Sequence, residues 1–255
     1  MLIAMTRAVS PRIAECELTH LAREPINPGR ARKQHRRYEE LLAELGCELH
    51  HLPPEPELPD SVFVEDTAVV LDELAVITRP GAELRRAETA SVAEALKPYR
   101  KLFHIEPPGT LDGGDVLRIG KMLYVGQSER SNHQGIAQLR RLLAGYGCQV
   151  IPVPLCGCLH LKSAVTEVAD KTLLINPAWT DTRVFDSFKL IAVDSLEPFA
   201  ANALRIGDSV IYPEAFPKTR KRLEAQGIKI RGVNASELAK AEGGVTCCSL
   251  IFTAE

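Results

Sequence analysis

Apolar positions along this chain recur with two different periods, one typical of helices and the other of strands. Between 26 and 45, apolar residues such as Tyr38, Leu41 and Leu45 follow one another at three- or four-residue intervals, and Gly46 comes next. This spacing predicts a helix that ends at the glycine. The preceding stretch, 12–29, has no clear period and contains two prolines. Because long segments without regular structure often cover functional sites, we expect a lid loop there.

Four further segments predict β-hairpins. Each contains two apolar, β-rich runs around a short turn, and they occupy 61–79, 112–126, 160–176 and 199–212. Amphipathic helical patterns lie between or after them, at 85–96, 132–143 and 217–226.

The hairpin turns recur at regular intervals, which indicates an internal repeat. Their separation is 48 residues from Glu73 to Lys121, 49 from Lys121 to Asp170 and 38 from Asp170 to Asp208. The tetrapeptide Leu-Arg-Ile-Gly also occurs twice, at 117–120 and 204–207. A strand–turn–strand–helix unit repeated every ~40–50 residues is typical of radial or stacked repeats rather than of a Rossmann alternation.

The two ends of the chain carry one strand pattern each, at 2–7 and 245–252, without a neighbouring strand to pair with in sequence. We expect these strands to pair with each other, which would close a ring of five units. The predicted fold is α/β, a five-bladed α/β propeller formed by a single domain over 1–255.

Composition and charge exclude several classes of protein. Hydrophobic residues make up 45% and charged residues 25% of the chain, as in average globular proteins and unlike disordered chains or coiled coils. With 31 Lys and Arg against 33 Asp and Glu, there is no general attraction to nucleic acid or to an anionic membrane. No apolar run approaches the roughly 18 residues of a membrane span, and the N-terminus has no signal-peptide pattern. We therefore expect a cytoplasmic protein with neither nucleic-acid nor membrane partners.

The seven cysteines do not form a recognisable framework. Their number is odd and no Cys-x-x-Cys pair occurs, which argues against a disulfide scaffold or a zinc ribbon. In a reducing compartment we expect most of them to be small core side chains and one or two to be reactive.

The repeat predicts which reactive side chains lie close together in the fold. If the first strand of each unit lines the axis of the ring, residues near the strand starts converge on one central cavity. These residues are Phe63, Asp112, His160, Phe199 and Cys247. A carboxylate, an imidazole and a thiol would then face one another.

Cys247 follows Gly243-Gly244 and is the candidate nucleophile, although a buried strand cysteine is the more common situation for this residue type. On a strand, Cys248 would face the opposite way. His160 is either a general acid and base or an ordinary core histidine. A zinc site formed by Cys156, Cys158 and His160 is disfavoured, because strand alternation would put all three on one face.

The charged residues around this cavity predict the shape of its ligand. Glu65 and Asp66 could brace a planar guanidinium, although on a continuous strand Asp66 would face away from Glu65. Arg85 and Arg130 each lie just beyond the second strand of a unit, where they are either exposed helix-start residues or a carboxylate-binding pair at the cavity mouth. The predicted ligand is cationic at its buried end and anionic at its outer end, as an arginine-like amino acid is.

In this order, the residues resemble the dimethylarginine dimethylaminohydrolases of the guanidine-modifying (pentein) superfamily, over about 18–252. The motifs that carry the resemblance are Pro59-Asp-Ser-Val-Phe-Val-Glu-Asp66, Ile77-Thr-Arg-Pro-Gly-Ala82 with Arg85-Arg86, Thr110-Leu-Asp-Gly-Gly-Asp115, Leu159-His-Leu-Lys162, Ala201-Asn202 and Gly243-Gly-Val-Thr-Cys-Cys-Ser249. The family has the five-bladed fold that the repeat predicts.

The resemblance implies a role for individual residues. Cys247 is expected to be the nucleophile, His160 the proton-transferring residue and Asp112 the acidic third member, where some relatives have Glu. The positions expected to bind substrate are Leu18, Asp60, Phe63, Glu65, Asp66, Arg85, Arg130 and Ala241. Ala241 stands where relatives have a larger aliphatic residue.

The implied reaction is hydrolysis of an Nω-methylated arginine to citrulline and a methylamine through a covalent thiouronium on Cys247, with no metal or organic cofactor. The alternatives are a related hydrolase acting on free arginine or another guanidino compound, an amidinotransferase, and a non-catalytic binding module. The last class lacks the cysteine, histidine and acidic set. The sequence leaves the oligomeric state open, a homodimer included.

Overall fold

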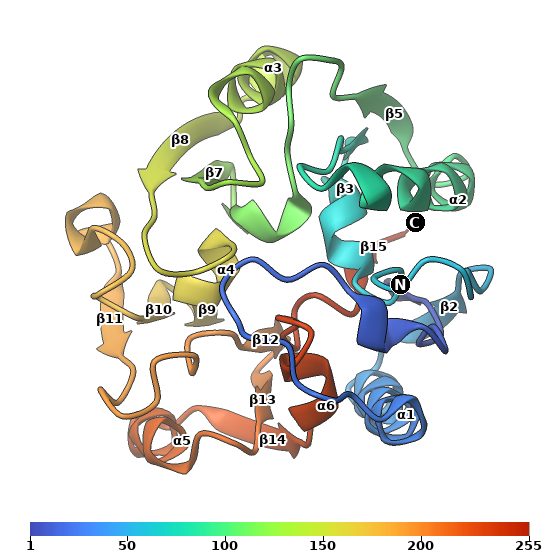
Figure 1. Ribbon diagram of the computed structural model, residues 1–255. Helices are drawn as coiled ribbons and strands as arrows, with labels where there is room; N and C mark the ends of the chain where they lie inside the picture. The colour runs from blue at the N-terminus through green and yellow to red at the C-terminus, as the bar shows by residue number, and fades with distance from the viewer. Residues whose placement is uncertain (255) are drawn as a thin grey trace.

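The strands form five three-stranded sheets of one construction, seen around a common centre in Figure 1. The computed structural model describes residues 1–254. In each sheet the first two strands are antiparallel and the third pairs parallel with the second. The sheets are β15 (Leu250–Thr253), β1 (Leu2–Thr6) and β2 (Glu48–His51); β3 (Ala68–Val70), β4 (Leu74–Ile77) and β5 (Lys101–His104); β6 (Val116–Ile119), β7 (Met122–Gln127) and β8 (Gln149–Pro154); β9 (Val165–Ala169), β10 (Thr172–Ile175) and β11 (Lys189–Ala192); and β12 (Leu204–Ile206), β13 (Ser209–Pro213) and β14 (Lys229–Val233).

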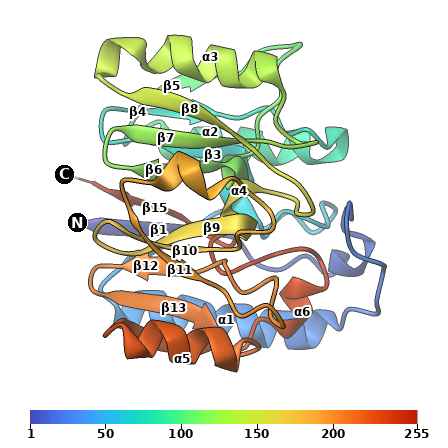
Figure 2. The ribbon, with the colours of Figure 1, turned by 90° about the vertical axis from the view of Figure 1, so that its left-hand side faces the viewer.

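The predicted pairing of the two terminal strands is confirmed. β1 and β15 are antiparallel, with Leu2 opposite Thr253 and Met5 opposite Leu250. The ends of the chain lie close together on one side of the molecule in Figure 2. Four predicted hairpins are also present, but the third, parallel strand of every sheet was not predicted, because these strands are short and partly polar.

Helices connect the second strand of each sheet to the third, as a parallel connection requires. The connections contain α1 (Pro28–Glu44); η3 (Glu83–Glu88) and α2 (Thr89–Leu96); α3 (His133–Leu143) and η5 (Ala144–Tyr146); η6 (Thr182–Phe185); and α5 (Pro217–Ala225). The predicted helices agree with these bounds to within a few residues. Figure 2 shows α1, α3 and α5 on the outside of the sheets.

Helix α1 shows why the sequence begins and ends a helix where it does. The Asn27 side chain accepts a hydrogen bond from Arg30 N, and Pro28 occupies the first turn, where a missing N–H costs nothing. Gly46, at φ 91°, follows the last turn. Between these ends, the face that carries Tyr38 and Leu42 is buried.

The apolar core is divided into five clusters, each between two neighbouring sheets. The middle strands alternate their side chains between two clusters: Leu74 and Val76 face one cluster, whereas Ala75 and Ile77 face the next. Because both faces of these strands are buried, they are continuously apolar in the sequence. The cluster that contains α1 also joins β1 to β12, β13 and β14, so every sheet has a packed neighbour on both sides.

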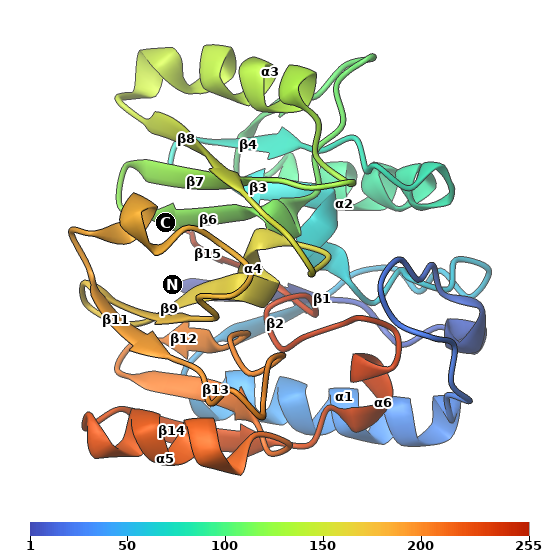
Figure 3. The same cartoon turned by 60° about the vertical axis from the view of Figure 1, so that its left-hand side comes forward.

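Short helical turns precede the first strands of several sheets. They are η2 (Val64–Thr67), η4 (Gly113–Asp115) and α4 (Leu161–Ala164), and α6 (Ser236–Ala239) and η1 (Ile13–Glu15) lie on the same side of the molecule (Figures 1 and 3). The sequence predicted that strands would begin at 61, 112, 160 and 245. Those starts are wrong, since the strands begin at 68, 116, 165 and 250. No helix of the described residues is long and apolar enough to cross a membrane.

Candidate active site

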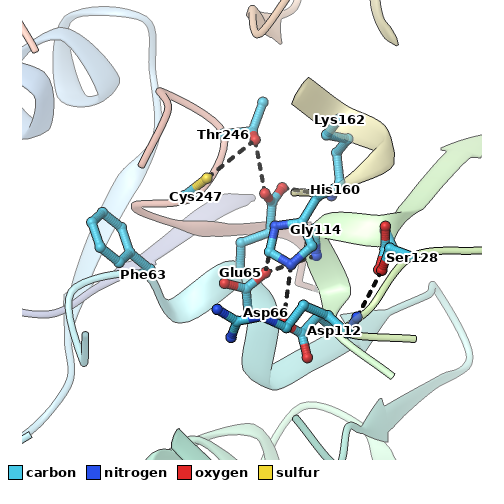
Figure 4. Close-up of polar contacts among 12 residues, drawn as sticks. Phe63, Glu65, Asp66, Asp112, Gly114, Ser128, His160, Lys162, Thr246 and Cys247 are labelled. Carbon is cyan, nitrogen blue, oxygen red and sulfur yellow. Dashed lines mark hydrogen bonds and ion pairs between the residues drawn. The ribbon is translucent and has the colours of Figure 1, made fainter. Parts of the chain in front are cut away.

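Cys247 lies in a turn, not on a strand, and Figure 4 shows it beside Thr246. Its backbone N–H donates to Gly244 O at 3.3 Å, and the N–H of Gly244 points to the Cys247 sulfur, also at 3.3 Å. The predicted close approach at the two glycines is present: a Cβ at Gly243 would lie 2.2 Å from the Phe63 ring, and one at Gly244 would lie 2.3 Å from Asn202 Oδ1. Because the segment is a turn, the prediction that Cys248 points away by strand alternation does not apply. The Cys248 thiol is buried and donates to Gly244 O.

His160 immediately precedes α4 and lies between two carboxylates (Figure 4). Its Nε2 is 3.0 Å from Asp112 Oδ2, and its Nδ1 is 3.8 Å from Asp66 Oδ1. Burial alone would lower the pKa of His160, but the nearby carboxylates of Asp66, Asp112 and Asp115 outweigh it and raise the pKa to about 9. The imidazole is therefore protonated at neutral pH and can donate a proton.

Asp112 precedes η4 and is fully buried behind His160. Its Oδ1 accepts the N–H of Gly81, and its own N–H donates to Ser131 Oγ. Both contacts hold the carboxylate in place against the imidazole. Asp112 therefore contacts His160 as predicted, although it does not line the cavity itself.

Glu65 and Asp66 are on the 3-10 turn η2, so the strand alternation predicted for them is wrong. Asp66 pairs with Arg85 Nη1 at 2.6 Å and accepts the N–H of Gly114 at 2.9 Å. Burial would raise the pKa of Asp66, but the charges of His160 and Arg85 hold it at about 2. Asp66 is a carboxylate at every physiological pH.

Glu65 points in a different direction from Asp66. Its oxygens accept from Lys162 Nζ at 2.5 Å and from Thr246 Oγ1 at 2.7 Å. Burial raises the pKa of Glu65, and Lys162 offsets this only in part. Glu65 is not among the residues that line the cavity at Cys247. It lines a neighbouring cavity with Lys162 and Thr246, and its charge still acts on the Cys247 thiol.

The cavity at Cys247 is small, with a volume of about 20 Å³. Residues predicted for the site that line it are Asp60, Phe63, Asp66, Arg85, Arg130, His160, Ala241 and Cys247. Leu18 lies in the loop that covers it and packs, half-buried, against the core. The prediction for Phe199 is wrong: 47% of its surface is exposed, and it packs on Trp179 instead, outside this cavity.

The two arginines predicted at the cavity mouth are both buried. Arg85 pairs with Asp66 and with Glu88, and donates to Phe63 O at 3.0 Å. Arg130 Nη2 donates to Thr19 Oγ1 of the covering loop at 2.9 Å. Both arginines line the cavity wall rather than an open mouth, because the loop that contains Thr19 lies over them.

The alternative zinc site at Cys156, Cys158 and His160 is not formed. These residues lie in an irregular loop, where the Cys156 thiol is exposed and donates to Ala178 O, and the Cys158 thiol donates to His160 O. Among the described residues, the group whose ligand atoms come close enough for a metal is Asp66, Asp112 and His160, within 4.8 Å of one another. The same arrangement suits proton transfer, because each ring nitrogen of His160 faces a carboxylate.

Sequence reasoning missed several residues that support the site. Lys162, Thr246 and Asn202 form a chain in which the Asn202 amide donates to Lys162 O and to Thr246 Oγ1. Asp115 accepts from two serines and from Leu161 N, and burial raises its pKa to about 6. The signal that could have identified them was their place in the quoted motifs, one to three residues from a residue predicted for the cavity.

Comparison with known proteins gives a consistent result. The family model described as "N,N dimethylarginine dimethylhydrolase, eukaryotic" matches residues 18–251. The N(G),N(G)-dimethylarginine dimethylaminohydrolase of Streptomyces coelicolor is 42% identical over 97% of this chain and 95% of its own. That of Pseudomonas aeruginosa is 36% identical over 88% of this chain and 89% of its own.

Solved structures agree. A variant of the Pseudomonas aeruginosa enzyme in complex with citrulline superimposes with a TM-score of 0.93, at 33% identity over 98% of both chains. The N-terminal domain of a cyanobacterial arginine dihydrolase has a TM-score of 0.90 at 21% identity, covering 99% of this chain and 98% of that chain, and so shares the fold. With its motifs on the residues that surround the buried cavity, this chain belongs to the dimethylarginine dimethylaminohydrolase family.

Proposed function

We propose that this enzyme hydrolyses the guanidinium group of Nω-methylated L-arginine to L-citrulline and methylamine or dimethylamine. The observation that carries the proposal is the pairing of a protonated His160, held by Asp112 and Asp66, with Cys247 on the same buried cavity. The family relatives support the same substrate class.

In the first step, Cys247 loses its thiol proton to solvent as substrate binds, and the thiolate sulfur attacks the guanidinium carbon to give a tetrahedral adduct. Burial and the charges of Glu65 and Asp66 raise the pKa of this thiol to about 12, so it is neutral in the free enzyme. A bound guanidinium beside it would lower the pKa, because an opposite charge stabilises the thiolate. The Asp66 carboxylate lines the same cavity and stabilises the bound guanidinium cation there. The nucleophile is therefore activated by the substrate that it attacks.

In the second step, the bond from carbon to the methylated nitrogen breaks. His160 donates its proton to that nitrogen, the methylamine leaves, and a thiouronium remains on Cys247. Neutral His160 then takes a proton from water as the water oxygen bonds to the carbon. The sulfur–carbon bond breaks, citrulline is released, and His160 is protonated again.

The ends of the substrate are assigned by charge. Arg85 and Arg130 supply positive charge for the substrate carboxylate, and Asp60 supplies negative charge for its amino group. Leu18 and Ala241 would contact the amino-acid part through backbone groups, and Phe63 packs beside the alkyl chain. Glu65 supplies negative charge near the guanidinium end, because it accepts a hydrogen bond from Thr246, the residue before the nucleophile, and its charge acts on the Cys247 thiol.

The five sheets support a single-domain, five-bladed α/β propeller with the segment 12–29 as its lid. All seven cysteines are free, which fits a cytoplasmic protein in a reducing compartment.

A citrulline assay across arginine, monomethylarginine and both dimethylarginines tests the function. We expect turnover of methylarginines, abolished in Cys247→Ser and retained in Cys248→Ser, whose thiol is also buried but lies outside the cavity. Normal turnover by Cys247→Ser would exclude the covalent route, and turnover of arginine alone would reassign the substrate.

A further inference from the structure

The cavity at Cys247 is too small for any substrate of arginine size while the covering loop is in place. Its volume of about 20 Å³ is roughly that needed by one water molecule. Glu17 from the covering segment 12–29, hereafter the lid, forms part of its wall. The lid must therefore move away each time substrate enters or product leaves.

Packing does not account for the closed position of the lid at 19–21. His20 is exposed, and His20 and Leu21 border a second, larger cavity of about 620 Å³ rather than packed protein. In Figures 1 and 3 the lid crosses the face of the molecule that also carries α6 and the segment before Cys247. Hydrogen bonds must hold it there.

The hydrogen bonds converge on one side chain, the carboxylate of Glu242. Three consecutive backbone N–H groups of the lid donate to it: Thr19 N at 2.9 Å, and His20 N and Leu21 N at 2.6 Å each. Hydrogen bonds to a carboxylate are about twice as strong as those between neutral groups.

The backbone of Glu242 gives a second, independent observation. Its φ is 57°, in the left-handed region that a residue with a Cβ rarely adopts. Such a conformation persists where the surroundings require it and often marks a functional position. Here it lies between Ala241 and Gly243, and all three residues line the catalytic cavity.

The other contacts near this end of the lid come from proposed substrate-binding residues. Asp60 accepts the N–H of Glu17 at 3.0 Å, and Arg130 donates to the Thr19 hydroxyl at 2.9 Å. When substrate is bound, Asp60 also pairs with its amino group and Arg130 with its carboxylate, as proposed above. At 19–21, the contacts of Glu242 serve the lid itself; further along, the lid is held by Asn27 N to Glu237 and by Lys240 Nζ to Pro25 O.

We propose that Glu242 is a positioning residue that latches the lid closed through the three N–H groups and so sets the affinity for substrate. It acts through the lid and takes no part in bond breaking. The kinetic part of this proposal rests on the proposed function, whereas the latch itself does not.

The test compares Glu242→Gln and Glu242→Gly with Glu24→Gln. Gln keeps one acceptor oxygen without the charge, and Gly removes the carboxylate while fitting the left-handed backbone. Glu24 is an exposed lid residue outside the latch, so its variant removes the same charge without breaking these contacts. Hydrogen exchange of the lid peptide without substrate, and KM and kcat for a methylarginine, are measured for each.

We expect lid exchange at 19–21 to accelerate at least about tenfold in Glu242→Gly. KM should rise roughly 10- to 100-fold, with kcat changed less than about threefold, and Glu242→Gln should fall between Gly and wild type. Glu24→Gln should match wild type in both measurements.

Unchanged lid exchange in both Glu242 variants would overturn the latch, whatever the kinetics show. Accelerated exchange with unchanged KM would overturn its link to substrate affinity. If exchange accelerates but the wild-type enzyme makes no citrulline from methylarginines, the latch stands and the proposed function fails.

Discussion

Replacing Asp112 by Asn removes one of the charges that keep His160 protonated, and should move the pH range in which the enzyme works. Asp112 Oδ2 lies 3.0 Å from His160 Nε2, and neither side chain is open to solvent. Asn has nearly the same volume, and its carbonyl oxygen can still accept the N–H of Gly81. The change therefore removes charge with little change in packing.

The size of the effect follows from the geometry. Two unit charges about 4 Å apart interact by about 4 kcal/mol at an effective dielectric constant of about 20, equivalent to about 3 pKa units. Measured effects of one neighbouring charge are about 1–3 units. Since the pKa of His160 is raised to about 9 in the wild type, we expect a value between about 6 and 8 in Asp112→Asn, with Asp66 and Asp115 still in place.

The sign of the pH dependence is set by the role of His160 as an acid. The protonated form is needed in the enzyme–substrate complex, where the bound cation has already favoured the Cys247 thiolate, so kcat should fall as pH rises through the pKa of His160 in that complex. In Asp112→Asn the fall should occur about 1–3 pH units lower. At pH 8 and a pKa near 7, only about a tenth of the variant would be protonated, a loss of about tenfold.

Two measurements check this: NMR titration of the His160 ring, and the pH profile of kcat at saturating substrate. Asp112→Glu is the matched control, because it retains the charge and should keep the pKa well above 6.5. An Asp112→Asn variant that folds normally but whose His160 titrates at the wild-type pKa would refute the electrostatic reasoning. A shifted pKa with an unshifted rate profile would refute the role of His160 as the acid.

Two further comparisons test the supporting structure. Lys162→Met should leave the buried Glu65 carboxylate without its ion partner and lower the free energy of unfolding by about 3–5 kcal/mol. Lys121→Met removes a surface ion pair and should lower it by less than about 1 kcal/mol. Equal losses for the two variants in chemical denaturation would contradict the difference in burial. Gly244→Ala should reduce citrulline formation at least about tenfold, because its Cβ would lie 2.3 Å from a buried amide oxygen. The control Gly145→Ala should keep its activity, because a Cβ there meets nothing within 4 Å. Full activity in Gly244→Ala would show that the turn before Cys247 can shift without cost.

The repeat and the closure of the ring were readable from the sequence because they depend on local patterns. Each middle strand is buried on both faces, which makes it a continuous apolar run, and the turns between the runs are short and polar or glycine-containing. The terminal strand patterns at 2–7 and 245–252 had no other partner, and β1 and β15 do pair. The parallel third strands were not readable, since strands such as β2 (Glu48–His51) alternate little and are half-exposed.

The identity of the reactive residues was also accessible, but their directions were not. Strand alternation placed Asp66 away from Glu65, and Cys248 opposite Cys247. In the structure a 3-10 turn and a tight turn occupy these positions, and Glu65 rather than Asp66 points away from the cavity at Cys247. Local sequence does not resolve such turns, because their shape depends on contacts with neighbouring sheets.

The sequence by itself determined the repeating unit, the pairing of the chain ends and the set of residue types at the centre. Only the tertiary structure decided which charges meet. His160 is protonated because carboxylates from two different segments, Asp66 and Asp112, reach it in a buried site where bulk solvent screens them little. Glu242 holds the lid because 223 residues of chain fold back to bring it to Thr19. Interactions of this kind depend on distance and burial in space, and neither is written in the spacing of residues along the chain.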